Sequence, residues 1–221
     1  MHTREPAASH TLLSEREIGN LAPVSLHHPP GTYRLTPASM VCIRALSQNQ
    51  WLFGGTGIDW GCGTGCLAIV AAKIPGVRSV IGLDVSRSDV EAAGENAVLN
   101  GVAQSTTFLR ADSYRALTLQ GQETLQRVAG DIDFVVSNPS GSVGDDGFSL
   151  RSAVLAGSCE FLRDGGIVAL QISIQYGRIR IDRALRPLTG LTYERVIATT
   201  PWVPFDLRRE DLRRLLGRWV V

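Results

Sequence analysis

The stretch that decides the fold runs from Gly57 to Ala71 and is G-I-D-W-G-C-G-T-G-C-L-A-I-V-A. A short apolar run that ends at Asp59 predicts a buried strand, and the small residues from Cys66 onward predict a helix. Between them, glycine stands at every second position. Glycine permits the positive φ angles of a sharp turn and lets a ligand approach the backbone. A strand, a glycine turn and a helix in this order begin a nucleotide-binding βαβ unit, in which the first helical turn offers free N–H groups to the ligand.

The spacing of the glycines narrows the class of ligand. The dinucleotide fingerprint is G-x-G-x-x-G/A, whereas Gly61, Gly63 and Gly65 follow the acid Asp59 as acidic-x-G-x-G-x-G. That pattern resembles motif I of the class I S-adenosylmethionine-dependent methyltransferases. The resemblance covers residues 31 to about 200 and implies S-adenosyl-L-methionine as cofactor. It also implies an α/β fold: a Rossmann-like, doubly wound, mostly parallel sheet of about seven strands in three αβα layers.

A second acid supports this interpretation. The apolar run Val77–Asp84 predicts a strand with an acid at its carboxyl end. An acid about 20 residues after the glycine turn can accept hydrogen bonds from both ribose hydroxyls, and the family places an acid at this point. The alternative is that Asp84 caps the helix that starts near Ser86, since Asp caps helices well.

The resemblance implies further cofactor contacts. The backbone of the turn, at Gly61, Cys62, Gly63 and Gly65, is expected to face the methionine part, and Val85 to lie beside the adenine. Asp112, at the end of a strand predicted over 106–111, matches the family position that recognises the adenine amino group, where a carboxylate accepts from N–H. Asp112 as a plain turn carboxylate is the alternative. Tyr33 precedes a helix predicted from Pro37, and either contacts the cofactor or lies at the edge of the core.

The candidate catalytic residues are Asn138 and Pro139, directly after a strand predicted over 131–137, where open α/β sheets place their active sites. They resemble the first half of the N-P-P-aromatic motif. In that group the Asn side chain and the adjoining backbone carbonyl accept hydrogen bonds from a planar nitrogen, and the implied Asn138 position also touches the cofactor. Ser140 and Gly141 replace the second proline and the ring, so the stacking half is missing. A simple strand-ending turn is the alternative.

Composition bounds the other possibilities. The chain has 221 residues, 44% of them hydrophobic, and a net charge of +1, which fits one domain with some decoration. No apolar run approaches a membrane span, and RNA binding gains no support because nucleic-acid surfaces usually carry a strong basic excess. All four histidines precede residue 29 and none of the four cysteines forms a C-x-x-C pair, so no metal site is expected. Reduced cysteines suggest a cytoplasmic protein.

Two regions are expected. Residues 1–30 form an N-terminal extension, either a lid or a loosely ordered tail, in which Ser14 to Glu17 fits a helix-opening capping box. Residues 31–221 form the methyltransferase domain, with a further strand predicted over 192–198 and a helix over 177–188. A glycine-rich, acidic loop, 141–147, lies near the expected site.

The sequence therefore predicts an enzyme, a methyltransferase that acts on a nitrogen of a small molecule or a peptide amide, with no general base assigned. Two alternatives stay open. One is a non-catalytic cofactor-binding module with a decayed site that serves a protein partner. The other is an RNA base methyltransferase, which the missing aromatic ring and the charge of +1 disfavour.

Overall fold

A computed structural model of the chain describes residues 9–140, 148–172, 182 and 190–199. Its strands are β1 (Ser9–Leu13), β2 (Val24–His28), β3 (Gly55–Trp60), β4 (Val77–Asp84), β5 (Thr106–Asp112), β6 (Arg115–Ala116), β7 (Ile132–Ser137) and β8 (Leu162–Leu170). Its helices are α1 (Pro37–Gln48), the 3-10 turn η1 (Gln50–Leu52), α2 (Cys66–Ala72), α3 (Arg87–Leu99), α4 (Leu119–Val128) and α5 (Ser149–Phe161).

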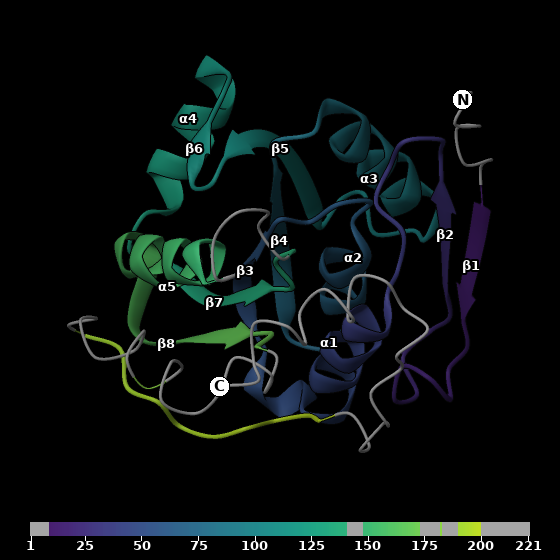
Figure 1. Cartoon of the computed structure of the whole chain (residues 1–221), viewed down its shortest axis with the longest axis horizontal. Helices are drawn as coiled ribbons and strands as arrows, with labels where there is room; N and C mark the ends of the chain where they lie inside the picture. Colours follow the sequence, from purple (N-terminus) through teal and green to yellow (C-terminus); the bar gives the residue numbers. More distant parts are fainter. Residues whose placement is uncertain (1–8, 141–147, 173–181, 183–189, 200–221) are drawn as a thin grey trace, which may run out of the picture.

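Six strands form the central sheet in the order β6-β5-β4-β3-β7-β8 (Figure 1). All neighbours are parallel except the short edge strand β6, which pairs antiparallel with β5. The order reverses direction at β3, because β4 and β5 extend to one side of it and β7 and β8 to the other. Open α/β sheets bind ligands at such a switch point, outside the carboxyl ends of the strands.

Helices cover both faces of the sheet, which confirms the predicted three-layer αβα class (Figure 1). One apolar core joins the sheet to α1, α2 and the β1–β2 hairpin, and its fully buried members include Leu26, Ile43 and Phe134. The other core joins the opposite face to α4 and α5, with Ile58 and Val154 completely buried.

The β1–β2 hairpin is fastened to α3 by two asparagines. Asn96 accepts from the His27 N–H (2.8 Å) and donates to the His27 carbonyl (3.0 Å). Asn100, the C-cap residue of α3, does the same to Ser25, at 2.9 and 2.7 Å. The two asparagines are four residues apart on a helix and rise about 6 Å, and the two strand residues are two apart and rise about 6.6 Å. The matching spacing lets the helix side chains bind the backbone of β2 as a neighbouring strand would.

The predicted helix from Ser14 is one turn only. Only half of its capping box forms: the Glu17 carboxylate accepts from the Ser14 N–H (2.9 Å). The Ser14 hydroxyl donates to the same carboxylate (2.7 Å), and the Glu17 N–H donates to the Ser14 carbonyl instead. The turn then stops at Gly19 and Asn20, whose φ angles of 61° and 65° are left-handed and end a helix. This turn packs against the core, because the side chain of Ile18 is completely buried.

One other prediction differs from the structure. The strand predicted over 192–198 is irregular: its apolar side chains Tyr193 and Val196 are mostly exposed, and Ile197 is only partly buried against the core, so no continuous buried face holds it to the sheet. Within β8 the register shifts before Ile167, where Gly165 has a φ of 74°. The predicted helix over 177–188 and the loop 141–147 lie outside the described residues, apart from residue 182.

Candidate functional site

The glycine turn is anchored to the end of the neighbouring strand. The N–H groups of Gly61 and Cys62 both donate to the Leu83 carbonyl at the end of β4, at 2.8 and 2.9 Å. Gly61, Gly63 and Gly65 have φ angles of 69°, 51° and 86°. This is the left-handed region that only glycine enters readily, so the predicted reason for all three glycines is confirmed.

The three glycines face different surroundings. A methyl group at Gly61 would meet nothing within 4 Å, whereas one at Gly63 would lie 3.0 Å from the Tyr33 side chain. At Gly65 it would lie 3.0 Å from the Ala93 methyl of α3. Gly65 therefore allows helix packing, Gly63 allows the approach of Tyr33, and Gly61 leaves its face of the turn open to a ligand.

Asp84 braces the turn. One oxygen of its carboxylate accepts from the Gly63 N–H and the other from the Ser86 N–H, both at 2.9 Å. The N-cap of α3 is Ser86 itself, whose hydroxyl accepts from Asp89, so Asp84 does not fill the capping role that was the alternative. A carboxylate has about four acceptor positions, which leaves capacity for the ribose hydroxyls.

Asp59 is completely buried at the end of β3. Its Oδ2 accepts from the Ala68 N–H of α2 at 2.9 Å, while its Oδ1 has no hydrogen-bond partner among the described residues. Burial, together with the nearby negative charge of Asp84, raises the pKa of Asp59 to about 7 against the lowering effect of the Ala68 N–H. The buried carboxyl group two residues before the turn places negative charge behind the turn when it is ionised, which favours a ligand that carries positive charge, as S-adenosylmethionine does.

Tyr33 reaches both the turn and the strand end beyond it. Its N–H donates to Asp89 on α3 (2.7 Å), and its ring lies against Gly63. Its hydroxyl lies 3.2 Å from the hydroxyl of Ser39 on α1 and 3.4 Å from Nδ2 of Asn138. The residue is 37% exposed, so part of the ring is open beside the glycine turn.

The predicted adenine end is at the surface. Val85 is 59% exposed, and the Asp112 carboxylate is paired loosely with Arg115 at 3.8 Å. Between them and β3, the Trp60 indole donates to the Ser113 hydroxyl (3.1 Å), which fixes the turn after β5. Ser113 has a φ of 56°, so the chain bends sharply where Asp112 ends the strand. Both predicted residues are accessible to a ligand at this edge.

Asn138 and the glycine turn leave neighbouring strands at the same level. Trp60 and Ser137 are register partners in β3 and β7, and the Ser137 hydroxyl donates to the Trp60 carbonyl at 2.8 Å. Gly61 and Asn138 are the next residues on each strand. The structure therefore brings the two predicted motifs together, about one strand spacing of 4.8 Å apart.

Arg151 is a site residue that sequence reasoning missed. Its side chain is buried beside β7 and donates to the Pro139 carbonyl at 3.1 Å and to Oε1 of Gln171 at 2.8 Å. One lone pair of the Pro139 carbonyl is thereby used within the protein, and a second remains. No local motif marks Arg151, and only its inward position on α5 could have drawn attention to it.

A second missed group joins the hairpin to the turn. The buried Asn96 also donates to the Thr64 carbonyl (2.9 Å), and His28 Nδ1 lies 3.0 Å from the Tyr33 carbonyl and 3.3 Å from the Thr64 hydroxyl. We call these contacts the hairpin seam: Asn96 and Asn100 bind the backbone of β2, and Asn96 and His28 bind Thr64. Burial lowers the pKa of His28, and the positive charge of Arg34 lowers it further, although the Tyr33 carbonyl acts in the opposite direction.

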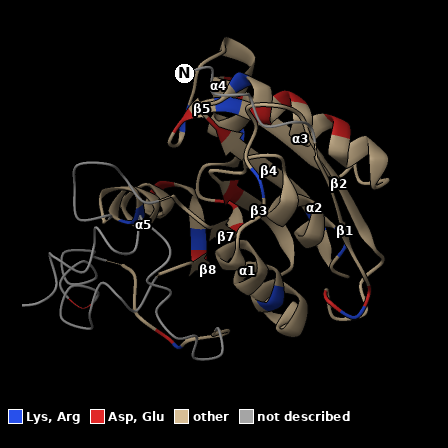
Figure 2. Ribbon diagram, turned by 45° about the vertical axis from the view of Figure 1, so that its right-hand side comes forward, with Lys and Arg blue, Asp and Glu red and all other residues tan. Residues whose placement is uncertain are grey.

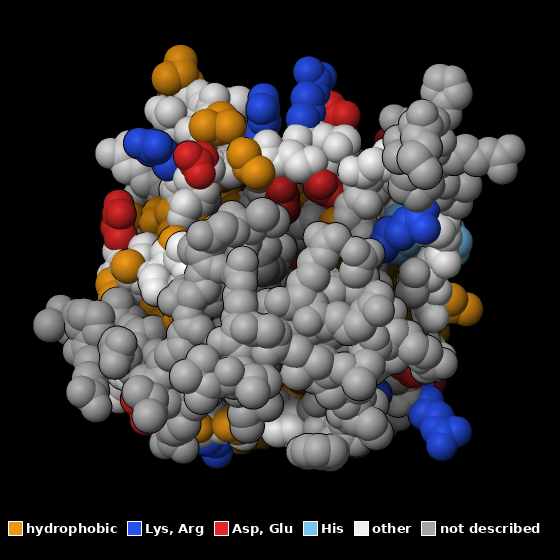
Figure 3. Space-filling view, viewed as in Figure 1, with side chains coloured by type: hydrophobic (Ala, Val, Ile, Leu, Met, Phe, Trp, Pro, Cys, Tyr) orange, Lys and Arg blue, Asp and Glu red, His pale blue; other side chains and the backbone are white. Residues whose placement is uncertain are grey.

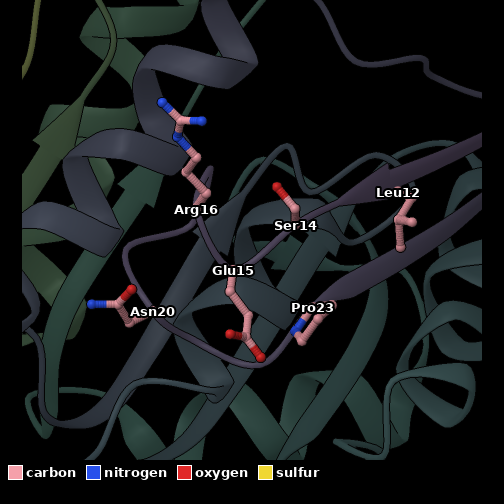
Figure 4. Close-up of a pocket in the computed structure, with 6 residues that line it drawn as sticks. All are labelled: Leu12, Ser14, Glu15, Arg16, Asn20 and Pro23. Atoms are coloured by element: carbon pink, nitrogen blue, oxygen red, sulfur yellow. The ribbon is translucent and has the colours of Figure 1, made fainter.

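One cavity lies far from the candidate site. A cavity of about 600 Å³ is lined by Leu12, Ser14, Glu15, Arg16, Asn20 and Pro23 (Figure 4). This loop contacts η1, just after the carboxyl end of α1, where the Gln50 side chain donates to the Gly19 carbonyl. Ser39 and Asn138 meet at the amino end of α1. The twelve residues of α1 separate the two places by about 18 Å.

Charges on the described surface are of mixed sign. Both acidic and basic residues occur on the described ribbon and on the described part of the visible face (Figures 2 and 3). No group of three His, Cys, Asp or Glu in the described ranges could hold a metal ion. Nor does any helix in those ranges have the length and apolar character needed to cross a bilayer.

Known proteins share this arrangement. A family model described as ribosomal protein L11 methyltransferase (PrmA) matches residues 31–139. The ribosomal protein L11 methyltransferase of Dechloromonas aromatica is 38% identical over 184 residues, which are 82% of this chain and 49% of the relative. That of Actinobacillus pleuropneumoniae serotype 3 is 34% identical over 152 residues, which are 63% and 50% of the two chains. The chain thus spans about half the length of these curated relatives.

Solved structures agree in fold. The ribosomal protein L11 methylase of Lactobacillus delbrueckii subsp. bulgaricus superposes with a TM-score of 0.52 at 20% identity, covering 76% of this chain and 78% of that one. TrmN from Thermus thermophilus superposes with a TM-score of 0.52 at 25% identity, covering 74% and 48%. The glycine turn, the acid after β4, the sheet order and these similarities together show that the chain belongs to the class I S-adenosylmethionine-dependent methyltransferases.

Proposed function

We propose that this protein methylates a nitrogen atom of a protein or peptide, with S-adenosylmethionine as the methyl donor. The observation that carries the proposal is the pairing of Trp60 with Ser137, because it brings the open side of Gly61 next to Asn138. A cofactor on the turn and an acceptor at Asn138 would then be neighbours, and holding two reactants in place supplies much of the rate of a displacement.

The residues divide the work. The backbone of residues 61–63 would hold the methionine part, with the charge of the buried Asp59 behind it. Asp84 would hold the ribose, with Val85 and Asp112 at the adenine. Tyr33 would cover the turn from the side. The bound cofactor supplies a methyl group made electrophilic by its sulfonium.

The acceptor nitrogen gives its lone pair to the methyl carbon as the carbon–sulfur bond breaks. The bonding pair stays on sulfur, and the surplus proton on nitrogen passes to water. In this chain Asn138 Oδ1, which has no partner among the described residues, would accept an N–H of the acceptor and aim its lone pair. The Pro139 carbonyl would use its second lone pair, because Arg151 occupies the first.

The acceptor class follows from the relatives and from the charge. The relatives named above are ribosomal protein L11 methyltransferases, which favours the peptide arm of the sequence prediction over a small metabolite. RNA is disfavoured by the net charge of +1, which offers little attraction to phosphate. The four free cysteines and these relatives are the basis on which we place the protein in the cytoplasm.

The first test is transfer of labelled methyl from S-adenosylmethionine to purified bacterial ribosomal protein L11, to short peptides and to total RNA, with S-adenosylhomocysteine binding measured by calorimetry. We expect binding, and label in protein. Asp84→Ala should weaken binding by about 2–3 kcal/mol, while Asp131→Ala, an exposed acid at the other end of the sheet, serves as the control. Label found only in RNA, or binding without any turnover, contradicts the proposal, and the second result supports the non-catalytic module.

A further inference from the structure

Three hydroxyl groups gather beside Asn138. They belong to Tyr33, to Thr36 at the N-cap of α1, and to Ser39 in its first turn. Tyr33 lies 3.4 Å from Thr36 and 3.2 Å from Ser39, and Thr36 lies 3.2 Å from Ser39, oxygen to oxygen. We call this group the hydroxyl triangle.

Hydrogen bonds with backbone N–H groups hold the three residues of the triangle in place. The Ser39 hydroxyl accepts from the Thr36 N–H (3.1 Å) and the Thr36 hydroxyl accepts from the Ser39 N–H (3.3 Å), which makes a reciprocal capping box. Ser39 is only 3% exposed. Tyr33 is held through its N–H by Asp89 and packs against Gly63. These oxygens therefore cannot move independently of α1 and the glycine turn.

Two hydroxyls of the triangle orient the Asn138 amide. Its Nδ2 donates to the Ser39 hydroxyl at 3.2 Å and to the Tyr33 hydroxyl at 3.4 Å. The Ser39 oxygen has two lone pairs. One accepts from the Thr36 N–H and the other from Asn138, so Ser39 donates its own hydrogen within the triangle. Because Nδ2 faces the triangle, Oδ1 is turned away from it.

We propose that the hydroxyl triangle is a positioning group, which holds the Asn138 amide so that Oδ1 faces the methyl acceptor. This inference rests on the proposed function and adds a specificity. The outward oxygen can only accept a hydrogen bond, so the site favours a methyl acceptor that carries a hydrogen on the reacting atom, as an amide or a primary or secondary amine nitrogen does. A hydroxyl-free oxygen acceptor or a tertiary amine offers no hydrogen to Oδ1.

The orientation can be measured without any turnover. In the ¹⁵N-labelled full chain, the Asn138 side-chain NH₂ signal is identified by its loss in Asn138→Asp, and its exchange with water is followed. We expect exchange to be about tenfold faster in Ser39→Ala, and to be restored in Ser39→Thr. Ser47→Ala removes another buried hydroxyl from the same helix and should leave the signal unchanged. Among the described residues, that hydroxyl makes one hydrogen bond, to the Arg44 carbonyl at 3.4 Å. Should Ser39→Ala not fold, Tyr33→Phe makes the same test while it keeps the ring on Gly63. An unchanged signal in the triangle variant overturns the inference.

Turnover gives the second measurement. With ribosomal protein L11 as acceptor, Ser39→Ala should lower kcat by about 10- to 100-fold, with S-adenosylhomocysteine affinity unchanged, and Ser47→Ala should match the wild type. A Ser39→Ala enzyme with full kcat overturns the inference and leaves the proposed function standing. A wild type that binds cofactor but transfers no methyl overturns the proposed function, and the NMR exchange rate then decides the positioning role alone.

Discussion

The glycine turn and the hairpin seam meet at Thr64, yet they are built in opposite ways. The turn is held by backbone groups, since the N–H groups of Gly61 and Cys62 donate to Leu83 and glycine supplies the required φ angles. The seam is held by side chains, since Asn96 and Asn100 bind the backbone of β2. The turn depends on the backbone φ angles of neighbouring residues, so adjacent residues encode it. The seam depends on hydrogen bonds from side-chain amides to residues about 70 positions away in the sequence.

The largest effect is expected from changing the turn itself. Gly65→Ala places a methyl group 3.0 Å from Ala93 at a φ of 86°. It should lower the free energy of unfolding by about 3–5 kcal/mol, the sum of left-handed strain and overpacking. Gly61→Ala has the same kind of φ but open space around it, and should cost only about 1–2 kcal/mol.

Chemical denaturation measures the free energy of unfolding of both variants, and calorimetry measures their affinity for the cofactor. Gly61→Ala should lose cofactor affinity by more than its small stability cost suggests, because its methyl group occupies the ligand side of the turn. Equal stabilities for the two variants would show that contact with α3 is unimportant.

The next effect concerns Asp59 and pH. Its pKa of about 7 in the folded protein exceeds the ordinary value of about 3.9, so the folded state binds this proton more tightly than the unfolded state does. The stability it contributes is present below about pH 4 and is lost as pH rises toward 7. Relative to Asp59→Asn, the wild type should lose about 2–3 kcal/mol between pH 5 and pH 8.

Denaturant titrations at several pH values test this, with the exposed Asp131→Asn as control. Binding of the cationic S-adenosylmethionine should also release a proton near pH 7, seen as a dependence of the binding enthalpy on the ionisation enthalpy of the buffer. A constant stability difference between wild type and Asp59→Asn at all pH values would contradict the raised pKa of Asp59.

The seam comes third. Asn96→Ala leaves the His27 backbone and the Thr64 carbonyl without their partner in a buried place. The free energy of unfolding should fall by about 2 kcal/mol, in the range found when buried polar groups lose their partners. Asn100→Ala, at the half-exposed end of the seam, should cost about 1 kcal/mol because water can replace the lost groups. If Asn96→Ala also weakens S-adenosylhomocysteine binding and Asn100→Ala does not, the seam supports the turn through Thr64.

The smallest effect is expected from His28. Because burial lowers its pKa in the folded state, the unfolded chain binds this proton more tightly, and the stability is present above about pH 6.5 and lost as pH falls. The sign is opposite to that of Asp59. The wild type should lose stability relative to His28→Gln between pH 7 and pH 5.5, measured by thermal unfolding. A loss of stability on raising the pH would contradict the lowered pKa of His28.

The sequence predicted what adjacent residues determine. The strand over Val77–Asp84, the glycine turn and the position of Asn138 after β7 match the structure, because buried strands and sharp turns have local signatures. It did not reveal Arg151, the hairpin seam or the hydroxyl triangle. Each of these joins residues from separate elements, and a single Asn, Ser or His on a helix or strand has no distinctive pattern until its partner is known. The strand predicted over 192–198 failed for a related reason, since an apolar alternation forms a strand only where a buried face accepts it.

The asparagines of α3 also protect an exposed edge. In a two-stranded sheet, β2 pairs with β1 on one side only, and the N–H and carbonyl groups of Ser25 and His27 point to the other. Unpaired groups on such an edge can bind the strand of another molecule and begin aggregation. Here the carboxamides of Asn96 and Asn100 occupy all four of them. The hairpin is therefore closed on this side to intermolecular strand pairing, with no need for the charged or proline residues that proteins often place there.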